Sequence, residues 1–215
     1  MKYTIHISLI TSLLLLAPCS MLLAQTKVTP QQQQQVVEKI DKATAAMKTM
    51  QCNFTQTKKM KLLKKEMVSQ GKMAFKGPNR LRWQYTSPYD YTFILNGDKV
   101  FIRTSKTSQN IDANRNKMFR QIADIILKSI TGGNLKSATD FTLQIWKTGN
   151  TYSARLYPKK KEMKQLYNVI EIFFNPQLTM VTSVKMEEKT GDITIVKLTD
   201  TKINAPVNET LFSAK

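Results

Sequence analysis

The side chains best suited to recognising a ligand are concentrated in one short stretch, GKMAFKGPNRLRWQYTSPYD. Within it, Arg80, Arg82, Trp83 and Tyr85 bring two guanidinium groups close to two aromatic rings. Such a set could stack the bases of a nucleic acid. If the stretch is a β-strand, however, Leu81, Trp83 and Tyr85 share one face and both arginines share the other. The same residues therefore fit either a nucleic acid or an apolar ligand.

The charge of the chain at first favours a polyanion, because its formal net charge at pH 7 is +18. The basic residues are nevertheless spread along the whole chain rather than gathered on one element. A distribution of this kind is typical of a solvated surface, and it also favours an anionic membrane surface. We therefore expect no nucleic-acid partner.

The N-terminal residues 1–24 have the layout of a secretory signal peptide. Met1–Lys2 carries positive charge, Leu9–Leu16 is apolar but too short to span a bilayer, and Leu22–Ala24 ends in a small residue. A lipid-anchored Cys19 is the alternative, but the proline before it fits a lipoprotein processing site poorly. We predict cleavage after Ala24, export of the protein, and a single domain over 25–215.

Catalytic and metal-binding residues are scarce in this predicted domain. The only histidine, His6, lies in the predicted signal peptide, so acid–base catalysis and the commonest zinc sites lose their usual residue. Glu187 and Glu188 are neighbours on a predicted strand, which points them to opposite faces. We expect no enzyme, no metal and no cofactor; a carboxylate pair assembled only by the fold is the catalytic alternative. Cys52, the one cysteine left after cleavage, cannot form an internal disulfide, and we expect it to be a small buried side chain.

Hydrophobic periodicity predicts one helix followed by many strands. Apolar residues recur at three- and four-residue spacing over 31–50, which indicates an amphipathic helix. From Cys52 onward the period is two, and residues 58–70 form a strand, a turn and a strand whose lysines suit an exposed edge. Further strands, separated by hairpin turns, are expected at 91–95, 99–104, 141–147, 151–157, 167–174, 178–187 and 192–199. This pattern predicts a mainly β fold with an antiparallel sheet that curls or closes.

One apolar helix, residues 117–133, interrupts the predicted sheet. Its stripe includes Phe119, Ile122, Ile125 and Ile126, and Gly132-Gly133 ends it. Such a broad stripe suits either a plug at one end of a barrel or a lid over a cavity. A sheet of this length has room for a ligand, and its strands carry adaptable methionines as well as aromatic side chains. An apolar ligand is therefore the best-supported class of partner.

Several motifs in sequence order resemble those of a known family. They are Phe54-Thr55-Gln56 after the N-terminal helix, then the run from Phe75-Lys76-Gly77-Pro78-Asn79 to Arg82-Trp83 and Pro88, the Asn-Gly-Asp turn at 96–98, the central apolar helix, and a final Thr-Gly-Asp hairpin followed by Asn204 and Phe212. Together they resemble the periplasmic outer-membrane lipoprotein carrier family LolA over essentially the whole predicted domain.

The resemblance implies an unclosed antiparallel β-barrel with an N-terminal helix, a central helical lid, and an apolar cavity for lipoprotein acyl chains. Such carriers act as monomers that receive cargo from an inner-membrane ABC release complex and deliver it to an outer-membrane acceptor. The positions that match the cavity lining are Phe75, Leu81, Trp83, Tyr85 and Phe93, and those that fall on the lid are Phe119, Ile122, Ile125 and Ile126.

The sequence departs from the family at one position before the proline of this motif. Carriers of the family have an arginine there that helps to tie the lid shut, whereas this chain has Gly77, so Arg80 or Arg82 would have to replace it. Related domains bind other lipids or sense envelope stress, and fold alone does not separate these functions. A carrier of another lipid and a lipid-binding stress sensor are therefore the alternatives.

Overall fold

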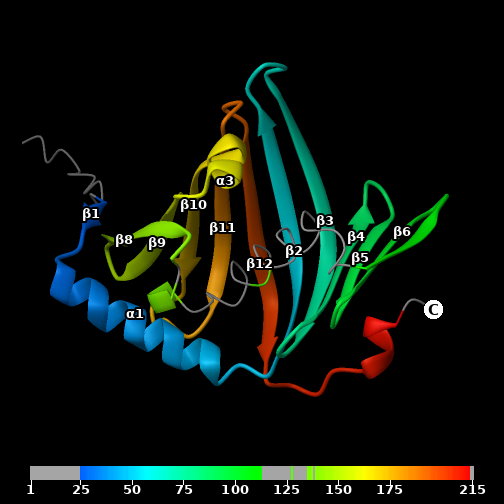
Figure 1. Ribbon diagram of the computed structural model, residues 1–215, viewed down its shortest axis with the longest axis horizontal. Helices are drawn as coiled ribbons and strands as arrows, with labels where there is room; N and C mark the ends of the chain where they lie inside the picture. The colour runs from blue at the N-terminus through cyan, green and yellow to red at the C-terminus, as the bar shows by residue number, and fades with distance from the viewer. Residues whose placement is uncertain (1–24, 113–126, 128–134, 138, 214–215) are drawn as a thin grey trace, which may run out of the picture.

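The computed structural model describes residues 25–112, 127, 135–137 and 139–213. They form a 12-stranded antiparallel sheet in which the strands are ordered β1-β8-β9-β10-β11-β12-β2-β3-β4-β5-β6-β7. The sheet curves but its two end strands, β1 and β7, do not pair with each other, so the barrel is unclosed (Figure 1). The predicted fold class is therefore confirmed, while the predicted lid residues Phe119, Ile122, Ile125 and Ile126 all lie outside the described residues.

The bounds of the elements are as follows. The strands are β1 (Thr26–Lys27), β2 (Thr49–Met60), β3 (Lys65–Lys76), β4 (Arg80–Ser87), β5 (Tyr91–Asn96), β6 (Lys99–Thr104), β7 (Ser108–Asp112), β8 (Phe141–Thr148), β9 (Thr151–Pro158), β10 (Tyr167–Phe174), β11 (Val181–Glu188) and β12 (Ile193–Ile203). The helices are α1 (Pro30–Ala45), α3 (Lys161–Leu166) and two short 3-10 turns, η1 (Leu135–Ser137) and η2 (Glu209–Phe212).

Helix α1 begins where the sequence predicted and ends earlier. Thr29 and Gln32 form a reciprocal capping box, with Pro30 in the first turn, so the start is well defined. The predicted helix over 31–50 is wrong in its last five residues, because Thr49 already belongs to β2. The side-chain oxygen of Asn204 accepts hydrogen bonds from the backbone N–H of Lys48 (2.7 Å) and Thr49 (3.4 Å), which fixes the chain in an extended form there.

The two longest strands, β2 and β3, form a regular hairpin in the middle of the sheet. Their register runs without a break from Thr49↔Lys76 to Met60↔Lys65, which confirms the predicted strand, turn and strand. The neighbouring strands β12 and β4 flank the pair over most of its length, but the pairing of β3 with β4 stops at Gln70↔Ser87, so the expected exposed edge is present only along residues 65–69 of β3. Figure 1 shows the turn of this hairpin at one end of the sheet. Lysines lie on both sides of that turn in the sequence.

A second boundary error concerns the strand predicted at 178–187, which begins at Val181. The side chain of Asn175 accepts hydrogen bonds from the backbone N–H of Thr179 (2.8 Å) and Met180 (3.2 Å), so these residues belong to a turn. Leu178 has a positive φ of 60°, which a strand does not allow. Three short elements, β1, β7 and α3, were not predicted at all.

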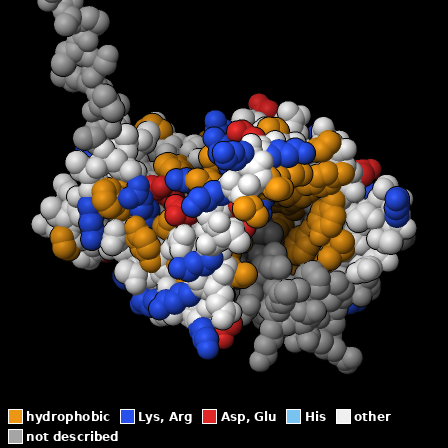
Figure 2. Space-filling model, turned by 90° about the horizontal axis from the view of Figure 1, so that it is seen from above, with side chains coloured by type: hydrophobic (Ala, Val, Ile, Leu, Met, Phe, Trp, Pro, Cys, Tyr) orange, Lys and Arg blue, Asp and Glu red, His pale blue; other side chains and the backbone are white. Residues whose placement is uncertain are grey.

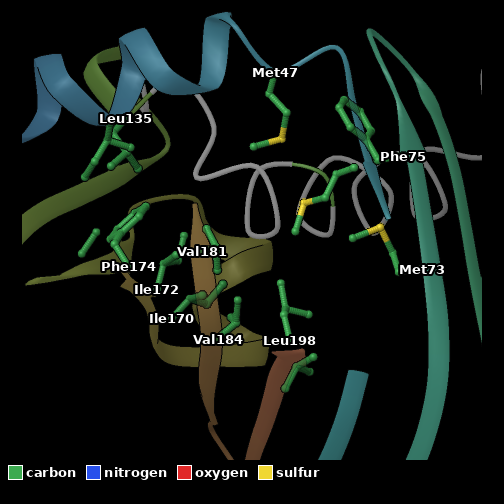
Figure 3. Close-up of a cluster of buried hydrophobic side chains, with 14 of the residues drawn as sticks. Met47, Met73, Phe75, Leu135, Ile170, Ile172, Phe174, Val181, Val184 and Leu198 are labelled. Carbon is green, nitrogen blue, oxygen red and sulfur yellow. The ribbon is translucent and has the colours of Figure 1, made fainter. Parts of the chain in front are cut away.

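The main core lies on one face of the sheet, which we call the inner face and define as the face that carries Trp83. Side chains from both halves of the sheet and from α1 join it. In Figure 3, Ile170, Ile172, Phe174 and Val184 lie together on one wall, and Met47, Met73 and Phe75 lie on the other. Cys52 is buried in this core, as predicted, and burial raises the pKa of its thiol to about 12.

A smaller core lies on the opposite, outer face of the sheet. Phe212, from the C-terminal segment, packs there against Ala74 and Ile94 and is almost fully buried. Strand alternation places Ala74 and Ile94 opposite the inner-face side chains next to them in the sequence. The C-terminal segment therefore covers the outer face of β3 to β5 and leaves the inner face to other partners.

Candidate functional site

The inner face is built around a row of aromatic and sulfur-containing side chains that crosses four neighbouring strands. The strand registers align Cys52 with Met73, Met73 with Trp83, and Trp83 with Phe93. The ring of Phe54 stacks on Trp83 with centroids 4.2 Å apart and an interplanar angle of 27°. Stacking of this kind holds both rings in defined positions.

Gly71 provides the space for this stack. It pairs with Phe54 across β2 and β3, and a Cβ atom at Gly71 would lie 2.4 Å from the Cζ atom of the Phe54 ring. The same Cβ would lie 2.1 Å from the backbone oxygen of Gln84. Both distances are far below van der Waals contact, so only glycine lets the Phe54 ring lie over β3 and reach Trp83.

The aromatic row becomes more polar toward the turn of the β2–β3 hairpin. The Tyr85 ring contacts Phe54 and Tyr91 edge-on, with ring centroids 5.2 Å and 6.0 Å apart. It also lies 5.3 Å from the Tyr89 ring, which is tilted by 39° relative to it. The Tyr85 hydroxyl donates a hydrogen bond to the side-chain oxygen of Gln56 at 2.9 Å. Burial raises the pKa values of Tyr85 and Tyr91, so both phenols stay neutral at physiological pH. These side chains combine an apolar body with a polar tip, as is common at the boundary of an apolar site.

The opposite wall of the inner face is aliphatic. Its strand registers place Ile172 between Ala154 and Val184, and place Val196 beside Val184. These side chains are buried and have no polar atoms. The two walls together make a broad apolar face on a curved sheet. Figure 2, viewed from above Figure 1, shows hydrophobic side chains gathered in a hollow.

A charged cluster ends the inner face on the same side as the hairpin turn. The ammonium group of Lys58 lies 3.0 Å from a carboxylate oxygen of Glu188 and 3.6 Å from one of Asp192. The hydrogen bond with Glu188 raises the pKa of Lys58. Thr194 donates a further hydrogen bond to Glu188 at 3.2 Å. The inner face thus passes from aliphatic and aromatic residues to a polar boundary.

The structure brings together all five predicted lining residues. Phe75, Leu81, Trp83 and Phe93 are buried in the inner-face core, and Tyr85 packs against it half-buried. The predicted lid residues Phe119, Ile122, Ile125 and Ile126 lie outside the described residues. Leu127, from the same predicted helix, is partly buried and packs against the core.

Both arginines of the aromatic stretch lie on the outer face, as the alternation predicted. Arg80 forms an ion pair with Glu209, which also pairs with Lys76. The guanidinium of Arg82 donates a hydrogen bond to the backbone oxygen of Leu211 at 3.1 Å. Both side chains therefore hold the C-terminal segment, and this arrangement argues against either one replacing the family's lid-tying arginine.

Sequence reasoning missed two important parts of the site. Phe54 was recognised only as part of a family motif, although its ring makes the closest contact with Trp83. Its alternation with Cys52, together with a glycine in the following strand, is the signal that could have identified it. The aliphatic wall was missed because runs such as Ile170 to Phe174 have apolar side chains on both faces, which hides the inner one.

A groove of about 320 Å³ also lies on the outer face, where Lys72, Arg82, Asp200 and Lys202 are among its lining residues. Its charged lining does not suit an acyl chain. Among the described residues, no group of three or more histidine, cysteine, aspartate or glutamate side chains could hold a metal ion. None of the described helices is long and apolar enough to cross a membrane.

Comparison with known proteins was made by sequence and by structure. An outer-membrane lipoprotein carrier protein from Legionella pneumophila (strain Corby) is 29% identical over 170 residues, which cover 79% of this chain and 80% of that protein. One from Pseudoalteromonas translucida is 22% identical over 168 residues, covering 78% and 77%. The Pseudomonas aeruginosa MucA/MucB complex contains a chain with the same fold at 10% identity, with a TM-score of 0.50 and coverage of 84% and 60%. The family model for the outer membrane lipoprotein carrier protein LolA matches residues 45–215, and the chain belongs to this family.

Proposed function

We propose that this protein is a periplasmic carrier that binds the acyl chains of lipoproteins on its inner face and shuttles them from the inner to the outer membrane. The observation that carries the proposal is the broad apolar inner face of an unclosed sheet, in a member of the LolA family. Relatives of similar length are named outer-membrane lipoprotein carrier proteins. The role is binding and transfer, without a catalytic step.

The chemistry of the inner face suits an acyl chain. Burial of apolar surface is non-directional and contributes about 0.8 kcal/mol per CH₂ group. About ten buried methylenes would therefore contribute about 8 kcal/mol, which corresponds to a Kd of about 1 µM before ordering costs are subtracted. The two walls supply aromatic and aliphatic contacts, while the polar boundary near Lys58 and Glu188 suits the peptide and glycerol part of a lipoprotein.

In this proposal, Phe75, Leu81, Trp83, Tyr85 and Phe93 line the binding face with Phe54. The helix that includes Phe119, Ile122, Ile125 and Ile126 serves as the lid. Because the sheet is unclosed, its walls can separate to admit a ligand without breaking a closed hydrogen-bonded ring. An inner-membrane ABC release complex would load the carrier and an outer-membrane acceptor would unload it, so the apo and loaded forms must differ in affinity for the two partners.

The two tryptophans allow a direct test of ligand placement. Trp83 lies on the inner face, whereas Trp146 lies on the outer face with the Arg155 guanidinium 4.2 Å from its ring centroid. Trp146→Phe leaves Trp83 as the reporter, and Trp83→Phe leaves Trp146 as the matched control. A diacylated lipopeptide with brominated acyl chains should quench Trp83 strongly and Trp146 weakly. Equal quenching of both, or none, would overturn the proposal.

A stress-sensor function is the second candidate, and the shared fold with a chain of the MucA/MucB complex is the observation that favours it. A sensor would bind a regulatory protein and would not move lipoproteins. Deletion of the gene separates the two roles: loss of a carrier retains lipoproteins in the inner membrane, whereas loss of a sensor changes stress transcription with lipoproteins still sorted correctly. A carrier of another lipid would instead be recognised by mass spectrometry of lipid that co-purifies with the protein.

A further inference from the structure

The β2–β3 hairpin ends in an unusual concentration of exposed apolar side chains. We call residues 58–68, KKMKLLKKEMV, the hairpin tip. Leu62 is 92% exposed and Leu63 65% exposed, and Met67 and Val68 are 40% and 51% exposed. The only other large hydrophobic residues exposed in the described part of the chain are Tyr89 and Leu166. Exposed apolar groups gathered in one place typically mark an interaction site.

Lysines surround the two leucines on both sides in the sequence. Five of them lie in the hairpin tip, together with one acidic residue, Glu66. Lys58 forms ion pairs with Glu188 and Asp192, and the ammonium nitrogen of Lys59 lies 3.8 Å from a carboxylate oxygen of Glu66. The remaining three, which are Lys61, Lys64 and Lys65, have no ion pair within the described residues and are exposed. The hairpin tip therefore presents an apolar end with unneutralised positive charge around it.

The hairpin tip is held out from the rest of the sheet by regular strand pairing. Pairing of β3 with β4 stops at Gln70↔Ser87, whereas pairing of β3 with β2 continues to Met60↔Lys65. On the other side, the backbone N–H of Lys61 donates a hydrogen bond to the Asp192 carboxylate at 3.1 Å. Figure 1 shows the β2–β3 turn projecting beyond the other strands. Because strand pairing and this hydrogen bond hold the hairpin in place, its turn can contact a flat surface.

We propose that the hairpin tip docks on the surface of an anionic lipid bilayer. Leu62 and Leu63 enter the boundary between headgroups and acyl chains, while Lys61, Lys64 and Lys65 lie at the level of the phosphates. Apolar side chains with flanking lysines are the combination that binds this interface, since the two contributions add. The leucines lie on a convex turn rather than in a groove, so they offer little area to a protein partner but fit a deformable lipid surface.

Docking by the hairpin tip would also orient the inner face relative to the bilayer. The polar boundary of the inner face, at Lys58 and Glu188, lies at the same end of the sheet as the hairpin tip. A carrier docked by this tip would bring that end of its inner face close to the bilayer. Docking itself requires no cargo, so its failure and the failure of the proposed carrier function can be separated.

Insertion of the leucines and attraction of the lysines to anionic lipid should contribute to vesicle binding by different, predictable amounts. Removing each leucine side chain should weaken vesicle binding roughly tenfold, if each is about half buried in the interface. Replacing all three unpaired lysines with glutamine should weaken it roughly 100-fold, at about fivefold per charge. Raising the salt concentration should mimic the lysine replacement, since the Debye length falls from about 10 Å at 0.1 M to about 3 Å at 1 M.

The test is flotation of the protein, purified from the periplasm, with vesicles of phosphatidylethanolamine and phosphatidylglycerol in a 7:3 ratio, and with pure phosphatidylcholine. The variants are Leu62→Ser/Leu63→Ser and Lys61→Gln/Lys64→Gln/Lys65→Gln. The matched charge control is Lys39→Gln/Lys42→Gln/Lys48→Gln, since these exposed lysines lie on and just after α1, away from the hairpin tip. All substitutions are at exposed positions, and the thermal unfolding curve of each variant checks its folding.

The expected result is binding to the anionic vesicles that both tip variants weaken and the α1 variant keeps. Absence of binding by the unaltered protein would overturn the proposal. Equal loss in the tip and α1 lysine variants would also overturn it, because general surface charge would then be responsible. Full binding by the serine variant would show that the leucines do not enter the bilayer and would overturn the insertion proposed here.

Discussion

Replacement of Gly71 by alanine tests whether the aromatic stack depends on a missing side chain. The new Cβ would lie 2.4 Å from the Phe54 ring and 2.1 Å from the backbone oxygen of Gln84. The ring could turn away, but the oxygen belongs to the β4 main chain and cannot move without disturbing the β3–β4 pairing. We therefore expect the Phe54 ring to leave its position over β3 and the stack with Trp83 to be lost.

The expected loss of stability follows from two opposing effects. Overpacking of a core costs about 1–3 kcal/mol, and the backbone contact at Gly71 favours the upper end of that range. The alanine also lowers the conformational entropy of the unfolded chain, which stabilises the folded state by about 0.4–1 kcal/mol. The free energy of unfolding should therefore fall by about 2 kcal/mol. For a domain of this size the midpoint of thermal unfolding should fall by about 4–8 °C.

Urea unfolding, followed by circular dichroism, measures the free-energy difference, and Gly77→Ala is the matched control. A Cβ at Gly77 would have its nearest neighbour 3.6 Å away, the backbone oxygen of Lys48, which is an ordinary contact. The Gly71 variant should also show altered Trp83 emission. If the two glycine variants differ by less than about 0.5 kcal/mol, the steric argument is refuted. Combining Gly71→Ala with Phe54→Leu should cost less than the sum of the two changes, since they share a contact.

Four further substitutions test the two faces of the sheet and the buried thiol. Trp83→Glu should abolish lipopeptide binding, measured by co-purification, whereas Gln84→Glu should retain it, because Gln84 is on the outer face of the same strand. Phe212→Ala should lower the free energy of unfolding by about 3 kcal/mol in urea without changing lipopeptide binding, because its ring is buried only on the outer face. The Cys52 thiol, with its pKa raised to about 12, keeps its proton when the unfolded thiol ionises near pH 9. Its contribution to stability is therefore lost as the pH rises from 9 to 12, by about 2 kcal/mol at pH 10.5, and Cys52→Ala should flatten that part of the pH profile.

The strands were predictable where one face of the sheet carries apolar side chains and the other carries polar ones. Leu81, Trp83 and Tyr85 alternate with polar residues, so a period of two is enough to place them on a common face. The short strand β7, with the sequence SQNID, has no such alternation and depends on pairing with β6. Helix α3 has only six residues, too few to show a helical period.

Tertiary contacts explain the remaining errors. Met47 and Met50 continue the apolar spacing of α1, yet the helix ends at Ala45. The side-chain oxygen of Asn204, far along the sequence, accepts hydrogen bonds from the backbone N–H of Lys48 and Thr49, where β2 begins. The C-terminal segment gives no sequence signal for the face that it covers, because that depends on Arg82 and Ile94 lying side by side on neighbouring strands. The site itself was recognised in part: its β4 and β5 residues were identified, whereas the Phe54 stack required the β2–β3 register.

Strand β4 shows how one register can serve both stability and binding. Its inner side chains, Leu81 and Trp83, join the apolar face, while the outer guanidinium of Arg82 holds the C-terminal segment. A slip of one residue would exchange the two sets, exposing a tryptophan beside the C-terminal segment and placing an arginine among buried rings. Desolvation already lowers the pKa of Arg82 on the outer face, and the packed inner face offers it no carboxylate among the residues aligned with Trp83. The register is therefore fixed by the cost of burying that charge as well as by the aromatic stack. A single substitution can alter one face of the strand alone, whereas a shift of register would disrupt the binding face and the outer support together.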